Sequence, residues 1–152
     1  AAPGGADAAI AAGLLPEAVE EAVPPPPAPA PTREELLERA KGDHWRAVPA
    51  LRALRRAADD DIATDEELAV LYLEAAQHDD DAIREEAVAG LAASPSTAID
   101  VLRVALADRV REIRILAAIG LRLRGEDGGV DVLRDAVDHP ELGARALGAL
   151  RR

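Results

Sequence analysis

The clearest pattern along the chain is a helical alternation of apolar and polar residues over 108–123. One face of the helix that it predicts carries Ile113, Ala117, Gly120 and Leu121. The same four positions recur thirty residues earlier and twenty-nine residues later. They hold Ile83, Ala87, Gly90 and Leu91 in the earlier copy, and Leu142, Ala146, Ala149 and Leu150 in the later one. The stretch 108–123 is therefore the middle copy of a repeated amphipathic helix.

A second repeat lies between these helices. The segment 99–106, Ile-Asp-Val-Leu-Arg-Val-Ala-Leu, matches 130–137, Val-Asp-Val-Leu-Arg-Asp-Ala-Val, at an offset of thirty-one. Two kinds of helix therefore alternate, and a period of about thirty residues built from helix pairs is typical of an α-solenoid. Since no strand pattern appears, the expected fold is all-α, with about four antiparallel helix pairs.

On these residues the chain resembles the HEAT-repeat family, in particular the short HEAT-like repeats also found in phycobilin lyase subunits. The shared pattern is an Asp near the turn, then an apolar residue, Arg, Ala and Leu. Two full copies read Asp79, Ile83, Arg84, Ala87, Leu91 and Asp108, Ile113, Arg114, Ala117, Leu121. The last copy reads Asp138, Leu142, Ala146, Leu150, with Gly143 where the Arg would stand. The resemblance covers 63–152 well and 32–58 less well, and it implies right-handed superhelical stacking.

Two domains are expected: an extended Ala/Pro-rich arm over 1–31 and a HEAT-like α-solenoid over 32–152. The Pro-rich run 24–31 is typical of a polyproline II spacer. Two interpretations of 8–23 stay open, a solvated tail and a short amphipathic docking helix, because isolated helices of this length are marginal. The apolar residues of that helix would be Ile10, Leu14, Leu15, Val19 and Val23.

Capping boxes predict where two helices begin. Thr32-Arg33-Glu34-Glu35 opens a helix over 33–41, and Thr64-Asp65-Glu66-Glu67 opens one that ends near Gln77. A helix over 44–58 is predicted between them, and Pro49 is expected to kink it or delay its start. Its apolar face comprises Trp45, Val48, Leu51 and Leu54.

The net charge of −11 is concentrated in one part of the chain. The segment 59–86 holds twelve acids and one base, so the rest of the chain is neutral in sum. Two interpretations stay open: a solvated acidic rim, and a docking surface for a basic partner. Nucleic acid is not expected as a partner, because phosphate binding needs a basic stripe. No apolar run is long enough for a membrane span.

Composition bounds the compartment and the source only loosely. There is no Cys, so no disulfide or thiolate chemistry is expected, and Lys41 is the only Lys among abundant Arg, Ala, Gly and Pro. That bias suggests a GC-rich bacterial genome. Ala1 would follow either a removed initiator Met or a cleaved signal peptide, so cytoplasmic and periplasmic or extracellular locations both stay open.

No catalytic constellation is visible. His44, His78 and His139 each precede a predicted second helix, and at whole-repeat spacing they lie too far apart for one zinc ion. The run Asp79–Asp81 beside His78 is interpreted as helix capping rather than as a metal site. Ser94 and Ser96 have no His beside them, and Gly125–Gly129 is not followed by the Lys of a phosphate loop. Gly90 and Gly120 are interpreted as close-packing positions, and Arg84 and Arg114 as residues that pair with Asp or carbonyls of the adjacent repeat.

The expected function is therefore non-catalytic binding, without a cofactor or metal. We expect a protein–protein interaction scaffold or accessory subunit of a larger bacterial assembly, which binds through the solenoid surface and the arm. The alternative, suggested by the resemblance, is a chromophore-lyase-like or other enzyme-associated subunit. The candidate partner-binding residues are Ile10, Leu14, Leu15, Val19, Asp79, Asp80, Asp81, Arg84, Glu85, Arg111, Glu112 and Arg145.

Overall fold

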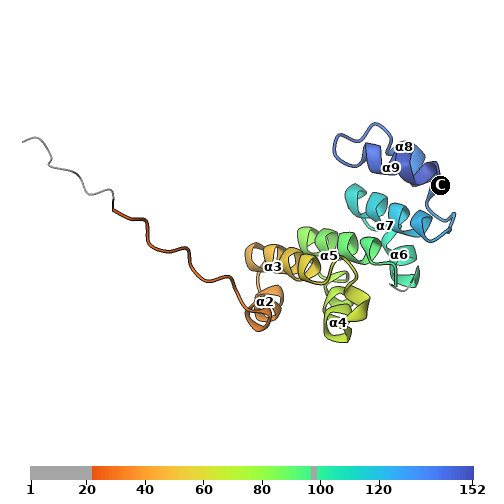
Figure 1. Ribbon diagram of the computed structural model, residues 1–152. Coiled ribbons are helices and arrows are strands. Elements are labelled where there is room, and N and C mark those ends of the chain that lie inside the picture. The colour runs from red at the N-terminus through yellow and green to blue at the C-terminus, as the bar shows by residue number, and fades with distance from the viewer. Residues whose placement is uncertain (1–21, 97–98) are drawn as a thin grey trace, which may run out of the picture. The chain divides into compact units, whose positions relative to one another are not determined.

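The computed structural model describes residues 22–96 and 99–152, and within these ranges every regular element is a helix (Figure 1). The all-α prediction is confirmed for this part of the chain. The helices are α2 (Arg33–Ala40), α3 (His44–Ala57), η1 (Ile62–Thr64), α4 (Glu66–Ala75), α5 (Asp81–Ala93), α6 (Ile99–Ala105), α7 (Arg111–Leu123), α8 (Val130–Asp135) and α9 (Gly143–Leu150).

The chain divides into two units, Ala1–Ala30 and Pro31–Arg152. The second unit contains all the helices given above. In the first unit, 22–30 is solvent-exposed and forms neither helix nor strand. Residues 1–21, which include most of the docking helix predicted over 8–23, lie outside the described residues. The predicted helix does not reach its expected end, because Ala22 and Val23 are not helical and Val23 is 88% exposed. None of the helices formed by 22–96 and 99–152 is long and apolar enough to cross a membrane.

The second helix of each predicted pair contacts the second helix of the next pair. In sequence order, α3 contacts α5, α5 contacts α7, and α7 contacts α9. The first helices pair locally, α2 with α3, α4 with α5, α6 with α7 and α8 with α9. In Figure 1 the first helices α2, α4 and α6 lie to one side of the row α3, α5 and α7.

Helix α7 is buried on two sides, which explains why 108–123 has the strongest pattern. Ile113, Ala117 and Leu121 belong to an apolar cluster that extends back through α5, α4 and α3 to α2. Ile115 and Ile119 belong to a second cluster, formed with α8 and α9. Burying apolar side chains on both sides of α7 removes them from water, which favours packing of α7 against both of its neighbours.

The small residues of the repeated pattern lie where helices touch. Ala87, Ala117 and Ala146 are fully buried. A Cβ on Gly90 would overlap the ring of Tyr72, and one on Gly120 would lie 2.8 Å from the Cβ of Ala92. The interpretation of both glycines as close-packing positions is confirmed.

Because Ala117 has no free space around it, Ala117→Leu is expected to lower the free energy of unfolding by roughly 1–3 kcal/mol through overpacking. Urea unfolding followed by helical circular dichroism measures the change. Ala144→Leu on an exposed position of α9 is the control. Equal stability of the Ala117→Leu variant and the unmodified chain would mean that the assigned repeat register is wrong.

The helices predicted to begin at Arg33 and His44 begin there, and the starts of α4 and α7 shift. Thr32 caps α2 with the full reciprocal capping box. Thr64 does not cap α4: Asp65 does, and its carboxylate accepts the backbone N–H groups of Glu67 and Leu68. Asp has a longer reach than the Thr hydroxyl and a charge that the helix N-terminus favours. Helix α7 begins at Arg111, later than the expected start at 108.

For α3, the predicted apolar face was wrong at Trp45, and of the two effects expected of Pro49 the delayed start does not occur. Trp45 does not join the apolar face: its side chain is 64% exposed, and the guanidinium of Arg46 lies 4.4 Å from its ring centroid. Pro49 does not delay the helix, which begins at His44 and continues through it. Pro49 lies in the second turn, so the only helical bond that it removes is the one to the carbonyl of Trp45, next to exposed side chains.

Candidate functional site

The buried ion pair between Arg84 and Asp108 joins two repeats. Arg84 on α5 is 8% exposed, and its Nε lies 3.0 Å from a carboxylate oxygen of Asp108, in the turn before α7. Its Nη1 donates to the carbonyls of His78 and Asp79, and its Nη2 to Asp81. The predicted pairing of Arg84 with the adjacent repeat is confirmed. All the donor groups of Arg84 are engaged inside the molecule, so the surface role expected for it has no support here.

The same arginine geometry returns one repeat later in a weaker form. Arg114 donates to the carbonyls of Asp108 and Arg109, at the same sequence separations as in the Arg84 contacts. These carbonyls belong to its own turn rather than to the adjacent repeat. In the last copy the carbonyl of Val137 lies against the Cα of Gly143, and a Cβ there would overlap it. This contact gives a physical reason for Gly at the position where the pattern has Arg.

Further ion pairs connect the other helices. Arg52 on α3 donates to the buried carboxylate of Glu86 on α5 at 2.9 Å. The Tyr72 hydroxyl on α4 donates to the carbonyl of Leu51 on α3. Burial of this tyrosine, and next the charge of Glu86, raise the pKa of Tyr72 above its ordinary value. These contacts connect α3 with α4 and α5.

Two acids of the run Asp79–Asp81 lie against basic side chains, and the third does not. Asp81 pairs with Arg84 and Arg109, and Asp80 caps α5 and lies 3.2 Å from the ring of His44. The capping interpretation of this run is confirmed for Asp80. For Asp81 the hydrogen bond from Arg109, followed by that from Arg84, holds the carboxyl pKa below its ordinary value. Asp79 is exposed, and its carbonyl accepts both arginines.

Four of the remaining candidates lie on α5, α7 and α9. Arg111 and Arg145 are exposed, and Glu85 and Glu112 are half-buried. Burial, followed by the charges of Glu112, Glu86 and Glu141, raises the pKa of Glu85 above its ordinary value. The negative charge of Glu112 on α7 therefore reaches Glu85 on α5. Arg111 is turned toward α8, where it donates to the carbonyl of Asp135 at 2.9 Å.

His139 acts as a cap. Its Nδ1 accepts the backbone N–H groups of Glu141 and Leu142, so the ring proton lies on Nε2, which is 3.2 Å from Glu112. His78 similarly accepts the N–H of Asp80. Within 22–96 and 99–152 no group of three or more His, Asp or Glu side chains is arranged to hold a metal ion.

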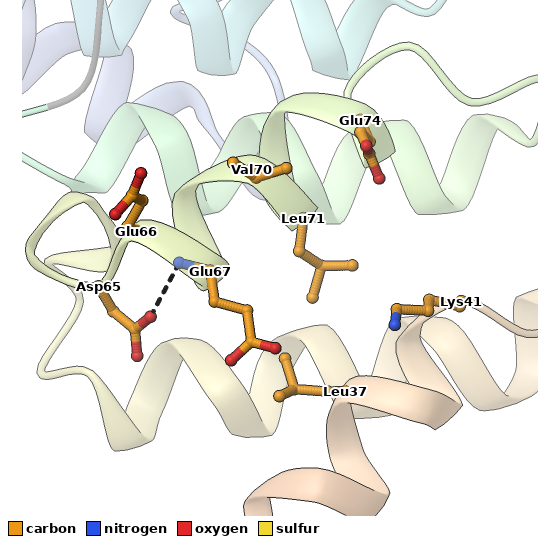
Figure 2. Close-up of a pocket in the computed structure, with 8 residues that line it drawn as sticks. All are labelled: Leu37, Lys41, Asp65, Glu66, Glu67, Val70, Leu71 and Glu74. Atoms are coloured by element: carbon orange, nitrogen blue, oxygen red, sulfur yellow. Dashed lines mark hydrogen bonds between the residues drawn. The ribbon is translucent and has the colours of Figure 1, made fainter.

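An open groove between α2 and α4 was not predicted from the sequence. Its volume is about 590 Å³, and it is lined by Leu37, Lys41, Asp65, Glu66, Glu67, Val70, Leu71 and Glu74. Figure 2 shows Leu37 of α2 and Leu71 of α4 pointing into the space between the two helices. Val70 is 50% exposed. The sequence does contain a sign of this groove. Residues 68–73 are all apolar, and a helix cannot bury six consecutive side chains against one core.

No family model, no curated protein and no solved structure matches this chain. The four arm residues among the candidates, Ile10, Leu14, Leu15 and Val19, lie outside the described residues.

Proposed function

We propose that the chain is a non-catalytic protein-interaction module, an α-solenoid of about four helix pairs that serves as a scaffold or accessory subunit. The observation that carries the proposal is the serial contact of α3, α5, α7 and α9, each with its own first helix. In such an array each pair buries its apolar side against its neighbours and leaves long outer faces free for partners.

The chemistry of the described side chains favours binding over catalysis. The carboxylates that lie nearest to the repeat interfaces are engaged with arginines, as in Arg84–Asp108 and Arg52–Glu86. A general acid–base pair needs two groups with separated pKa values in a shared pocket, and these groups are ion-paired across helices instead. An enzyme-associated subunit would use the same surface, and the identity of the captured partner distinguishes the two.

Affinity capture with matched surface variants tests the proposal. The full chain is used as bait under native conditions beside Glu85→Gln/Arg145→Gln, which neutralises one acid on α5 and one base on α9. These two residues, with Arg111 and Glu112 of α7, are called the α5–α9 face. The control, Asp100→Asn/Arg134→Gln, makes the same charge change on α6 and α8, at exposed positions. We expect the same proteins with the unmodified chain and the control, and weaker recovery with the face variant. Recovery of no specific protein, or equal recovery with all three baits, would contradict the proposal.

The arm has its own prediction. Deleting residues 1–31 is expected to leave the helical circular dichroism and melting temperature nearly unchanged, because the capping box at Thr32 already satisfies the first turn of α2. Capture of the partner is expected to weaken, since the apolar residues at 10–23 would lose their contacts with it. Undiminished capture would mean a passive tail, and loss of folding would mean that the arm is part of the folded body.

A further inference from the structure

We propose that the groove between α2 and α4 binds a basic amphipathic helix of a partner protein. This inference rests on the proposed function and adds a second docking surface to it, together with the chemistry of the partner that this surface would receive. The surface differs from the α5–α9 face tested above, so the two ideas can fail separately.

The floor of the groove is apolar and accessible. Leu37 and Leu71 face each other across it, both largely buried, and Val70 adds a half-exposed side chain (Figure 2). Helix α2 has its main contacts with α3, and α4 has its main contacts with α5, so the groove between α2 and α4 stays open and leaves Val70 half-exposed. Covering Val70 and the leucine edges with apolar side chains would remove them from water, which favours binding.

The rim of the groove selects a basic occupant. Asp65 and Glu67 share Arg33, at 2.7 Å each, and Lys41 pairs with Glu38. Among the described residues, Glu66 and Glu74 have no ion-pair partner. These two carboxylates border the apolar floor and are exposed. The lining as a whole holds four acids, Asp65, Glu66, Glu67 and Glu74, and one base, Lys41, so its charge is complementary to Lys or Arg on a partner.

The shape of the groove suits a helix. Its walls are two helices, and side chains of a third helix can fit between such ridges. An apolar stripe at helical spacing would cover Leu37, Val70 and Leu71, and basic residues beside the stripe would reach Glu66 and Glu74. A polyproline ligand would need an aromatic-lined groove, and this groove has no aromatic side chain. The described residues contain no strand, so strand addition at a sheet edge has no template there.

Three synthetic peptides test the chemistry, with binding followed by fluorescence anisotropy on the full chain. The first is a labelled helical peptide of about 15 residues with Leu at i, i+3, i+4 and i+7 spacing and Lys elsewhere. The second has Glu in place of Lys, and the third has the composition of the first with the leucines scattered around the helix. We expect binding of the first peptide only. No saturable binding of it, or equal binding of the other two, overturns the proposal.

Two matched valine variants locate the site. Val70→Glu places a charge on the groove floor, and Val104→Glu places the same charge on α6, where Val104 is 75% exposed. The added negative charge would strengthen purely electrostatic binding of a Lys peptide. We therefore expect Val70→Glu to weaken binding at least about tenfold, while Val104→Glu leaves it unchanged or slightly stronger. Equal effects of the two variants would overturn the groove proposal and leave the α5–α9 capture result standing.

A charge variant completes the test. Glu66→Gln/Glu74→Gln removes the two uncompensated rim charges, and Asp131→Asn/Asp135→Asn removes two exposed acids from α8. The rim variant is expected to lower affinity and to reduce its salt dependence, whereas the α8 variant has a smaller effect on both. Identical salt dependence in both variants would mean that the rim does not select the ligand. Melting temperatures of all variants verify that each protein is folded.

Discussion

Replacing Tyr72 with Ala is expected to lower the free energy of unfolding by about 3–5 kcal/mol, the range for removing a fully buried aromatic side chain. Tyr72 has no exposed surface, and it contacts two repeats at once. Its hydroxyl donates to Leu51 of α3, and its ring lies against Gly90 of α5. Tyr72→Phe keeps the ring and removes only the hydroxyl, so its expected loss is about 1 kcal/mol. Urea unfolding measures both.

A double-mutant cycle tests the contact between the Tyr72 ring and Gly90. Gly90→Ala adds a methyl group where the Tyr72 ring lies, so it is expected to destabilise the protein with Tyr72 present. In the Tyr72→Ala background the space is free, and the same substitution is expected to cost much less. Additive effects of the two substitutions would contradict the contact between α4 and α5.

Replacing Arg84 with Met is expected to lower the free energy of unfolding by roughly 2–3 kcal/mol, at or below the lower end for breaking a buried ion pair. The loss leaves Asp108 partly buried without its cation, and it frees the carbonyls of His78 and Asp79. Arg114→Met removes donors to carbonyls only, so about 1 kcal/mol is expected. Arg145→Met, at an exposed position, is the control and is expected to change stability by less than about 0.5 kcal/mol.

The pH dependence of the stability loss in Arg84→Met tests whether that loss comes from the ion pair with Asp108. Burial acts to raise the pKa of Asp108, but the hydrogen bonds from Arg84 and from the backbone of Val110 outweigh it, so the pKa lies below its ordinary value. The stabilisation that the Asp108 carboxylate contributes is therefore complete above its pKa in the unfolded chain, about 4. It is lost as the pH falls through the lower pKa of Asp108 in the folded protein. The stability difference between the unmodified chain and Arg84→Met should shrink over that acidic interval. A difference that stays constant down to low pH would assign the effect to the carbonyl contacts alone.

The parts of the fold that the sequence predicts are those encoded by local spacing. Ile113, Ala117 and Leu121 form a buried stripe because a helix brings these positions together wherever it packs. The capping box at Thr32 is equally local. Position-by-position comparison of the copies also identified Arg84 as an interior residue, since the pattern placed it beside the turn of the next repeat.

The features that the sequence does not predict depend on where another helix lies. Trp45 is exposed although it was placed on the same apolar face as buried Leu51, because the packing of the first turn of α3 buries Ala47 instead. The pairs Arg52–Glu86 and Arg33–Asp65 join residues more than thirty positions apart, so the acidic run was expected to carry more free charge than it does. The α2–α4 groove is likewise a property of two helices, and the run 68–73 only signals that some apolar surface stays uncovered.

One distance measurement tests the stacked-pair proposal most directly. The chain has no Cys, so cysteines introduced at exposed Arg56 on α3 and exposed Gly148 on α9 can be spin-labelled specifically. Pulsed electron paramagnetic resonance then measures the distance between the label on α3 and the label on α9, which α5 and α7 separate. If the helix pairs stack as proposed, the folded protein is expected to give a single narrow distance distribution, because three successive helix contacts hold α3 and α9 in one body. A broad distribution at full helical content would contradict the stacked-pair proposal, because the pairs would then be linked without a common stack.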